Sequence, residues 1–132
     1  MAKQITPFLM FQGADAEQAM DFYTSLFDDG RVLDITRYGP EGPGPEGTVH
    51  SARFSLNGQE FRCSDSFVTH GFSFTPSFSV WIEAESEDEL ARLFAALSEG
   101  GAPLMPLGDY GFSRSFGWVN DRYGVSWQLN LA

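Results

Sequence analysis

The chain has a single cysteine, Cys63, among its 132 residues. One cysteine allows neither an intramolecular disulfide nor a metal cluster built on cysteines. Basic residues are also scarce, because 8 Lys and Arg stand against 18 Asp and Glu and give a net charge of −10. A surface this acidic repels phosphate backbones and anionic lipid, so we expect no nucleic acid partner and no membrane partner.

Targeting signals and long hydrophobic runs are missing as well. Residues 1–4 contain no apolar stretch of the kind that a signal peptide needs. The longest apolar runs are far shorter than the ~20 residues of a membrane span. We therefore expect a cytoplasmic protein. What the sequence does have is core material, since 42% of its residues are hydrophobic and 13 are Phe.

Hydrophobic periodicity and turn residues divide the first half into five elements. The pattern predicts a strand over 5–11, a helix over 14–27, a strand over 31–38, and a hairpin of strands 48–56 and 59–64 that turns at Asn57-Gly58. Asp15 is predicted to begin the helix by accepting backbone N–H bonds. Residues 39–47, rich in Gly and Pro, are predicted to form a loop.

The same order begins again in the second half. The pattern predicts a strand over 77–83, a helix over 86–99, and strands over 103–107, 113–120 and 125–131. Ser86 and Glu89 have the spacing of a capping box. One constant offset sets Asp15 over Ser86, so the helix starts coincide. We predict an α+β fold, with two β-α-β-β-β modules (5–65 and 76–131) in one domain spanning 1–132.

Several segments of the chain, the last of them long, resemble one superfamily. They are Ile5–Leu9, Ala19–Tyr23, Ile35–Tyr38 and above all Phe116–Gln128 (FGWVNDRYGVSWQ). The chain resembles the vicinal oxygen chelate superfamily of glyoxalase, bleomycin-resistance and dioxygenase proteins, and most closely its PhnB-like branch. The resemblance implies helices on the convex side of the sheets and a ligand cavity on the concave side. The branch often has His-Ala-Glu where this chain has Ser51-Ala52-Arg53, and alternation would point the neighbouring His50 to the opposite face.

The PhnB-like branch is often labelled 3-demethylubiquinone-9 3-methyltransferase, a label that implies a nucleotide-like cofactor. Such cofactors usually bind a Gly-rich turn between a strand and a helix, where backbone N–H groups can approach the ligand. The Gly-rich run here lies between two predicted strands and contains prolines, which have no N–H to donate. We therefore expect no cofactor and discount the label.

Metal-dependent relatives hold their ion with four equivalent strand positions. The resemblance and the repeat carry these positions onto Thr6, Arg62, Ser77 and Gln128. None of the four offers a carboxylate or imidazole, and the guanidinium of Arg62 repels cations. We expect no metal. A one-residue slip in the fourth strand would instead turn Cys63 and Asp65 toward the cavity, and Asp65 could then bind a metal.

Strand alternation also sorts the side chains into two faces. The apolar set, which includes Phe78, Val80, Trp127 and Leu129, is predicted to meet the helices. The opposite face should form the ligand pocket and carry Thr6, Phe8, Met10, Arg62, Ser64, Ser77, Ser79, Trp81, Ser126, Gln128 and Asn130. Interior Ser, Gln and Asn need hydrogen-bond partners, which a ligand, water, a dimer partner or the Phe-rich loop could supply.

Three functions remain open on the sequence. The leading one is a metal-free protein that binds a small molecule. The second is a metal-dependent lyase, isomerase or dioxygenase. The third is a drug-sequestering protein, which the acidic charge and the aromatic Trp81, Tyr110 and Trp118 favour. We also expect a homodimer, because the Phe-rich stretch 67–78 carries more apolar surface than one irregular loop easily hides.

Overall fold

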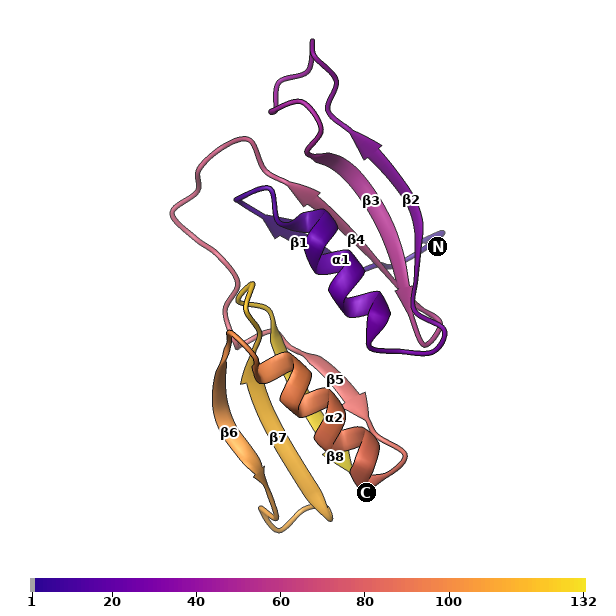
Figure 1. The fold of residues 1–132 in the computed structure, drawn as a ribbon, viewed down its shortest axis with the longest axis vertical. Coiled ribbons are helices and arrows are strands. Elements are labelled where there is room, and N and C mark those ends of the chain that lie inside the picture. Colours follow the sequence, from indigo (N-terminus) through magenta and orange to yellow (C-terminus); the bar gives the residue numbers. More distant parts are fainter. Residues whose placement is uncertain (1) are drawn as a thin grey trace. The chain divides into compact units, whose positions relative to one another are not determined.

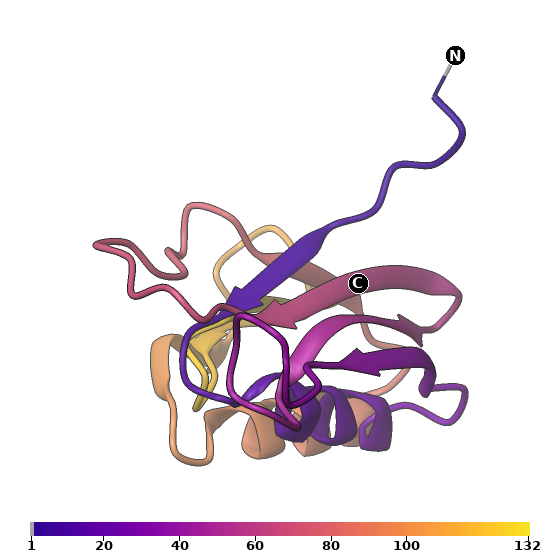
Figure 2. The same cartoon turned by 90° about the horizontal axis from the view of Figure 1, so that it is seen from above.

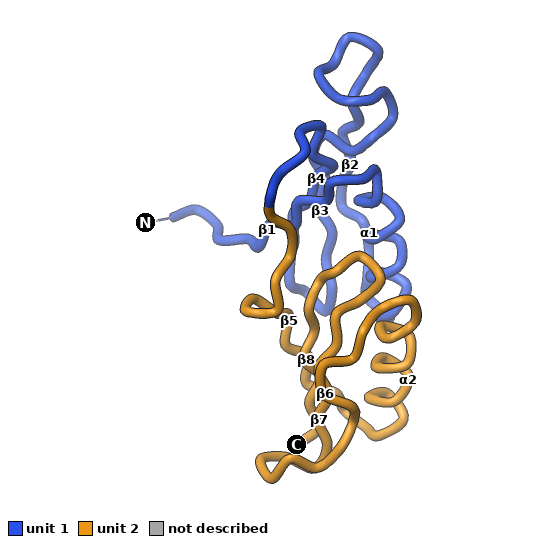
Figure 3. The backbone as a smooth tube through the Cα atoms, turned by 90° about the vertical axis from the view of Figure 1, so that its left-hand side faces the viewer, with its two compact units in different colours: residues 1–71 blue, residues 72–132 orange. Residues whose placement is uncertain are grey.

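The computed structural model describes residues 2–132, which form two compact units that meet in sequence between Gly71 and Phe72 (Figure 3). Each unit contains one helix and one four-stranded sheet. No helix within the described residues is long and apolar enough to span a membrane. The expectation that both units belong to one domain stays a prediction.

Unit 1 has the predicted order of elements (Figure 1). They are β1 (Phe8–Phe11), α1 (Ala16–Ser25), β2 (Arg31–Arg37), β3 (Val49–Leu56) and β4 (Gln59–Asp65). The order in the sheet is β1-β4-β3-β2. Strands β1 and β4 are parallel, and the other two pairs are antiparallel. The first and last strands of the unit therefore lie side by side.

Unit 2 repeats this arrangement. Its elements are β5 (Val80–Glu83), α2 (Glu87–Ser98), β6 (Ala102–Gly108), β7 (Ser115–Asn120) and β8 (Ser126–Leu131). The order in the sheet is β5-β8-β7-β6, and again only the first and last strands are parallel. The α+β class and the two β-α-β-β-β modules are confirmed.

In each unit the helix covers one face of the sheet, as Figure 2 shows for α1. The buried side of α1 consists of Ala16, Ala19, Met20 and Tyr23, and that of α2 of Leu90, Leu93 and Leu97. The strands contribute buried residues to the core, which include Phe54, Phe61, Trp127 and Leu129. The other side of each sheet carries no helix and is called the helix-free face below.

Both first strands are shorter than predicted. Strand β1 begins at Phe8 and not at Ile5, because Pro7 has no N–H for the ladder, although its carbonyl accepts the Arg62 N–H. Strand β5 begins at Val80, because the bond from the Phe78 N–H to the Thr75 carbonyl closes a turn. The prediction that Phe78 meets a helix is wrong, since 63% of this side chain is exposed.

The two helices begin in different ways. Asp15 makes no capping hydrogen bond with its side chain, so the prediction for this residue is wrong. The Ala16 N–H instead donates to the Asp65 carboxylate at the end of β4, at 2.9 Å. In α2 the Ser86 hydroxyl accepts the Glu89 N–H at 3.1 Å, as predicted, and the Glu89 carboxylate accepts the Glu85 N–H.

The β3–β4 hairpin turns where the sequence predicts. Asn57 and Gly58 both have positive φ, at 51° and 83°, which is the conformation that an Asn-Gly turn supplies. The other end of β3 is irregular, because the register against β2 shifts around His50. Val49 and Ala52 are both buried, so simple alternation fails there. The His50 ring lies 4.9 Å from the Tyr38 ring.

Candidate functional site

The helix-free face of unit 1 gathers four of the predicted site residues. Phe8 lies beside Arg62, and Met10 lies beside Ser64, in the parallel pairing of β1 with β4. Their strand neighbours Phe61, Cys63 and Asp65 are buried on the helix side. The β4 register is therefore the one that turns Arg62 toward the helix-free face. Thr6 lies before β1 and is not part of the ladder.

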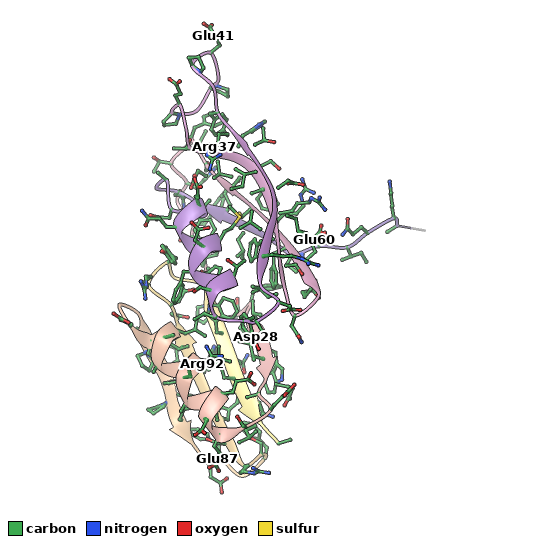
Figure 4. The ribbon with its side chains drawn as sticks, turned by 45° about the vertical axis from the view of Figure 1, so that its right-hand side comes forward. Asp28, Arg37, Glu41, Glu60, Glu87 and Arg92 are labelled. Carbon is green, nitrogen blue, oxygen red and sulfur yellow. The ribbon has the colours of Figure 1, made fainter. Side chains whose placement is uncertain are left out.

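Two arginines stand side by side on this face, because Arg62 and Arg53 are paired across β4 and β3. Arg53 is bound by Asp34 at 2.7 Å and by Glu60 at 3.0 Å, and Glu60 is labelled in Figure 4. Hydrogen bonding and charge attraction from Asp34, and then attraction from Glu60, raise the pKa of Arg53.

Arg62 forms no ion pair with a carboxylate among residues 2–132. The one hydrogen bond of its guanidinium within these residues is neutral, from Nη2 to the Ser51 Oγ at 3.3 Å. A guanidinium has five N–H donors, so most of its donors are unused. The side chain is partly buried between Phe8 of β1 and Arg53 of β3. This arrangement leaves the Arg62 guanidinium able to bind an anion through two parallel hydrogen bonds.

Sequence reasoning missed four of the residues around Arg62, namely Arg53, Ser51, Asp34 and Glu60. Ser51 contacts it, while Asp34 and Glu60 neutralise the arginine beside it. A signal was available for Ser51 and Arg53, which stand where the PhnB-like branch often has His and Glu. No local pattern could have found Asp34, since its partner is 19 residues away.

The helix-free face of unit 2 gathers five of the predicted residues. The pairing of β5 with β8 places Trp81 beside Gln128 and brings Asn130 to the same face. The Gln128 amide donates to the Ser79 hydroxyl at 2.6 Å. Ser77 lies before β5, where its hydroxyl is 2.8 Å from that of Thr75. Ser126, also predicted for this face, accepts the indole N–H of Trp118 at 2.8 Å.

Glu83 is a further polar residue of this face. It is paired with Asn130, whose amide donates to both carboxylate oxygens at 3.1 and 3.2 Å. The Trp81 indole N–H donates to the same carboxylate at 2.8 Å. Alternation could have found Glu83, which stands two residues after Trp81 and thus on the same side of β5. Glu83 is therefore an addition to the predicted pocket residues.

Phe116 of β7 is paired with Asn130 of β8 and is surrounded by aromatic rings. The Phe116 ring is 5.7 Å from the Trp81 ring, 6.1 Å from the Tyr110 ring and 5.0 Å from the Phe112 ring. Phe116 is buried, while the other three rings are 42–60% exposed. The helix-free face of unit 2 is therefore part aromatic and part acidic.

Asp65 lies on the other side of its sheet. One carboxylate oxygen accepts the Ala16 N–H and the other accepts the Val49 N–H, each at 2.9 Å. Both oxygens are thus engaged with the backbone, and the side chain is buried. Within the described residues no group of three or more His, Cys, Asp or Glu could hold a metal ion. The expected lack of a metal stays a prediction.

Cys63 faces the same side as Asp65 and is buried. Burial, with a smaller contribution from the charge of Asp65, raises the pKa of the thiol to about 12. The thiolate is the nucleophilic form of cysteine. Cys63 is therefore a packing residue of the core and not a nucleophile at neutral pH.

Comparison with known proteins identifies the family. The model described as 3-demethylubiquinone-9 3-methyltransferase matches residues 3–130. The chain belongs to this PhnB-like family. A PhnB protein from Bacillus cereus with the same description is 58% identical, with a TM-score of 0.95, and the match covers 98% of this chain and 100% of that one.

More distant structures share the fold. A glyoxylase/bleomycin resistance protein/dioxygenase domain from Frankia is 17% identical, with a TM-score of 0.68, over 100% of this chain and 93% of that one. TnmS3, an antibiotic-binding protein from Streptomyces, is 18% identical, with a TM-score of 0.57, over 99% and 98% of the two chains. No curated protein matches the chain. The glyoxalase/bleomycin-resistance type of fold is confirmed.

Proposed function

We propose that this PhnB-like protein binds a small organic molecule on its helix-free faces without a metal, and that Arg62 holds an anionic group of that molecule. The observation that carries the proposal is Arg62, a partly buried residue whose guanidinium has one hydrogen-bond partner within residues 2–132, the Ser51 hydroxyl. Burial of a charge is costly unless a partner compensates it, and a carboxylate or phosphate would do so. Phe8 and Met10 beside it offer apolar contact to the rest of the ligand.

The test is calorimetric titration of the full chain with phenylphosphate and benzoate. Arg62→Ala is expected to weaken binding about tenfold or more, because a hydrogen bond to a charged group contributes about 1.5–3 kcal/mol. Arg62→Lys is expected to recover part of the affinity, since it restores the charge but not the paired hydrogen bonds.

Arg37→Ala is the matched control, because Arg37 also lies in unit 1 and already pairs with Glu17. It is expected to leave the affinity unchanged. Equal losses in Arg37→Ala and Arg62→Ala would contradict the assignment to Arg62. Elemental analysis that finds about one zinc, nickel, iron or manganese per chain would overturn the metal-free proposal and favour the lyase, isomerase or dioxygenase alternative.

The alternative, a drug-sequestering protein, is supported by the aromatic rings of unit 2. Its support is the group of aromatic rings around Phe116 together with the likeness in fold to an antibiotic-binding protein. Flat aromatic ligands stack on such rings. This alternative shares the metal-free binding of the first proposal and differs in the ligand.

We further propose a cytoplasmic homodimer. Phe67, Phe72 and Phe78 are 53–63% exposed on the single chain. Exposed apolar surface of this kind is typical of an interface. Sedimentation at micromolar concentration is expected to give twice the chain mass of 14.6 kDa. A species of one chain mass would overturn the dimer.

A further inference from the structure

The pair formed by Glu83 and Asn130 on the helix-free face of unit 2 has unused capacity to accept hydrogen bonds. Asn130 is buried, and its amide nitrogen is committed to the Glu83 carboxylate. Its amide oxygen has no partner. Turning the amide over would direct the oxygen at the carboxylate, so the orphaned acceptor cannot be removed by a flip. A buried acceptor without a donor costs free energy.

The Glu83 carboxylate has only neutral hydrogen-bond partners among the described residues. Its contacts within residues 2–132 are the neutral N–H groups of Trp81 and Asn130, with no ion pair. Arg114, the basic residue just before β7, donates its backbone N–H to Leu131 and forms no ion pair with Glu83. A carboxylate has about four lone-pair positions, of which these contacts fill three.

The surroundings of this pair are aromatic. The Trp81 ring is half exposed beside the carboxylate, and it contacts the Phe116 ring at 5.7 Å. The exposed rings of Tyr110 and Phe112 flank Phe116 on its other sides. A tryptophan face attracts cations, and aromatic rings stack on one another.

We propose that this face of unit 2 binds an organic ammonium group attached to an aromatic ring. The ammonium donates to the Glu83 carboxylate and, once the side chains that cover it move, to the buried Asn130 amide oxygen. The aromatic part of the ligand lies on Trp81 and the rings around Phe116. This inference rests on the proposed small-molecule function and adds the ligand class for unit 2, whereas Arg62 in unit 1 serves an anion.

The experiment compares three probes of similar shape, namely phenethylammonium, neutral 2-phenylethanol and anionic 3-phenylpropionate. Binding is followed at low salt through the indole N–H signals in two-dimensional NMR spectra, with Trp81→Phe assigning the signal of Trp81. We expect the Trp81 signal to move and the buried Trp127 signal to stay. At this face phenethylammonium is expected to bind about tenfold more tightly than either other probe, since a charged hydrogen bond is added.

Glu83→Gln keeps the size of the side chain and removes its charge. It is expected to abolish the preference for phenethylammonium and raise its Kd about tenfold. Glu87→Gln, on the exposed start of α2 (Figure 4), changes the net charge equally and is expected to leave the Kd unchanged. Similar effects of the two substitutions, or equal binding of all three probes by the unmodified chain, would overturn the inference.

The outcome also separates this inference from the proposed function. If phenylphosphate binds through Arg62 while phenethylammonium leaves the Trp81 signal unmoved, the ammonium site is wrong and the proposed function stands. If none of the probes binds to either unit, both are wrong. The comparison of probe charges is made on the unmodified chain, so it remains decisive even if Glu83→Gln misfolds.

Discussion

Replacing Asp65 by asparagine is expected to lower the free energy of unfolding by about 2–4 kcal/mol. The two oxygens of this buried carboxylate accept the N–H groups of Ala16 and Val49, at 2.9 Å each. Asparagine has the same shape, but one oxygen becomes an NH₂ group that faces an N–H donor. One bond is lost and its N–H is left buried without an acceptor, which costs about 1–3 kcal/mol. The remaining bond loses its charge assistance, which costs about 1 kcal/mol more.

Urea unfolding followed by far-UV circular dichroism measures this change. Asp15→Asn is the matched control, because Asp15 stands at the start of the same helix and its side chain makes no capping bond. It is expected to change the unfolding free energy by less than about 0.5 kcal/mol. Comparable losses in the two variants would show that Asp65 is not the residue that caps α1.

The start of α1 shows what a sequence pattern can miss. Asp15 has the residue type and the position of a cap, and both are local properties. The carboxylate that caps Ala16 comes from a strand 49 residues further along the chain. Only the parallel pairing of β1 with β4 brings it there. Ser86 was predicted correctly because its partner, the Glu89 N–H, lies within the same turn.

Alternation assigned the faces of the regular strands correctly. In β4 and β8 every second side chain is buried against the helix, as Cys63 and Trp127 are. Arg62 and Gln128 stand next to these residues in the strands and therefore face away from the helices. The same rule failed for Phe78, because a turn at Thr75 delays the start of β5. Alternation also places Thr6 and Ser77 within strands, but β1 and β5 both begin after these residues.

The charge state of the candidate site could not be read from composition. Arg53 and Arg62 lie on one face of the sheet, and the sequence alone does not show which of the two pairs with carboxylates. The register places Asp34 and Glu60 against Arg53, which neutralises it and leaves Arg62 with a neutral contact. In unit 2, the pairing of β5 with β8 likewise brings Glu83 to Asn130, 47 residues apart. Such long-range pairs depend on the sheet order, which a periodic pattern does not contain.

Most of the family resemblance lies in Phe116–Gln128. This segment stabilises the fold of unit 2. Asp121 is buried within it and accepts the N–H groups of Tyr123 and Val125 at 2.8 and 3.1 Å. Its other oxygen accepts the indole N–H of Trp127 at 2.8 Å. One carboxylate therefore holds the β7–β8 turn and a core tryptophan together. The resemblance reports how unit 2 folds and does not by itself identify a ligand.

Asp121→Ala is accordingly expected to lower the free energy of unfolding by about 3–4 kcal/mol. The substitution leaves the N–H groups of Trp127 and Val125 buried without an acceptor, at about 1–3 kcal/mol each. Asp109→Ala is the matched control, since Asp109 accepts the Gly111 N–H at 2.8 Å in an exposed loop where water can replace it. This control is expected to cost less than about 0.5 kcal/mol.

A double-mutant cycle with Trp127→Phe isolates the bond between Asp121 and the indole. Phenylalanine removes the N–H donor, so in the Asp121→Ala background it no longer leaves an unpaired group. The double variant is expected to be more stable than the sum of the single losses predicts, by about 1–2 kcal/mol, because the two side chains are in direct contact. Urea unfolding followed by circular dichroism measures all four proteins in the same way. Strictly additive losses would mean that Asp121 stabilises the turn alone and that Trp127 holds its place by packing.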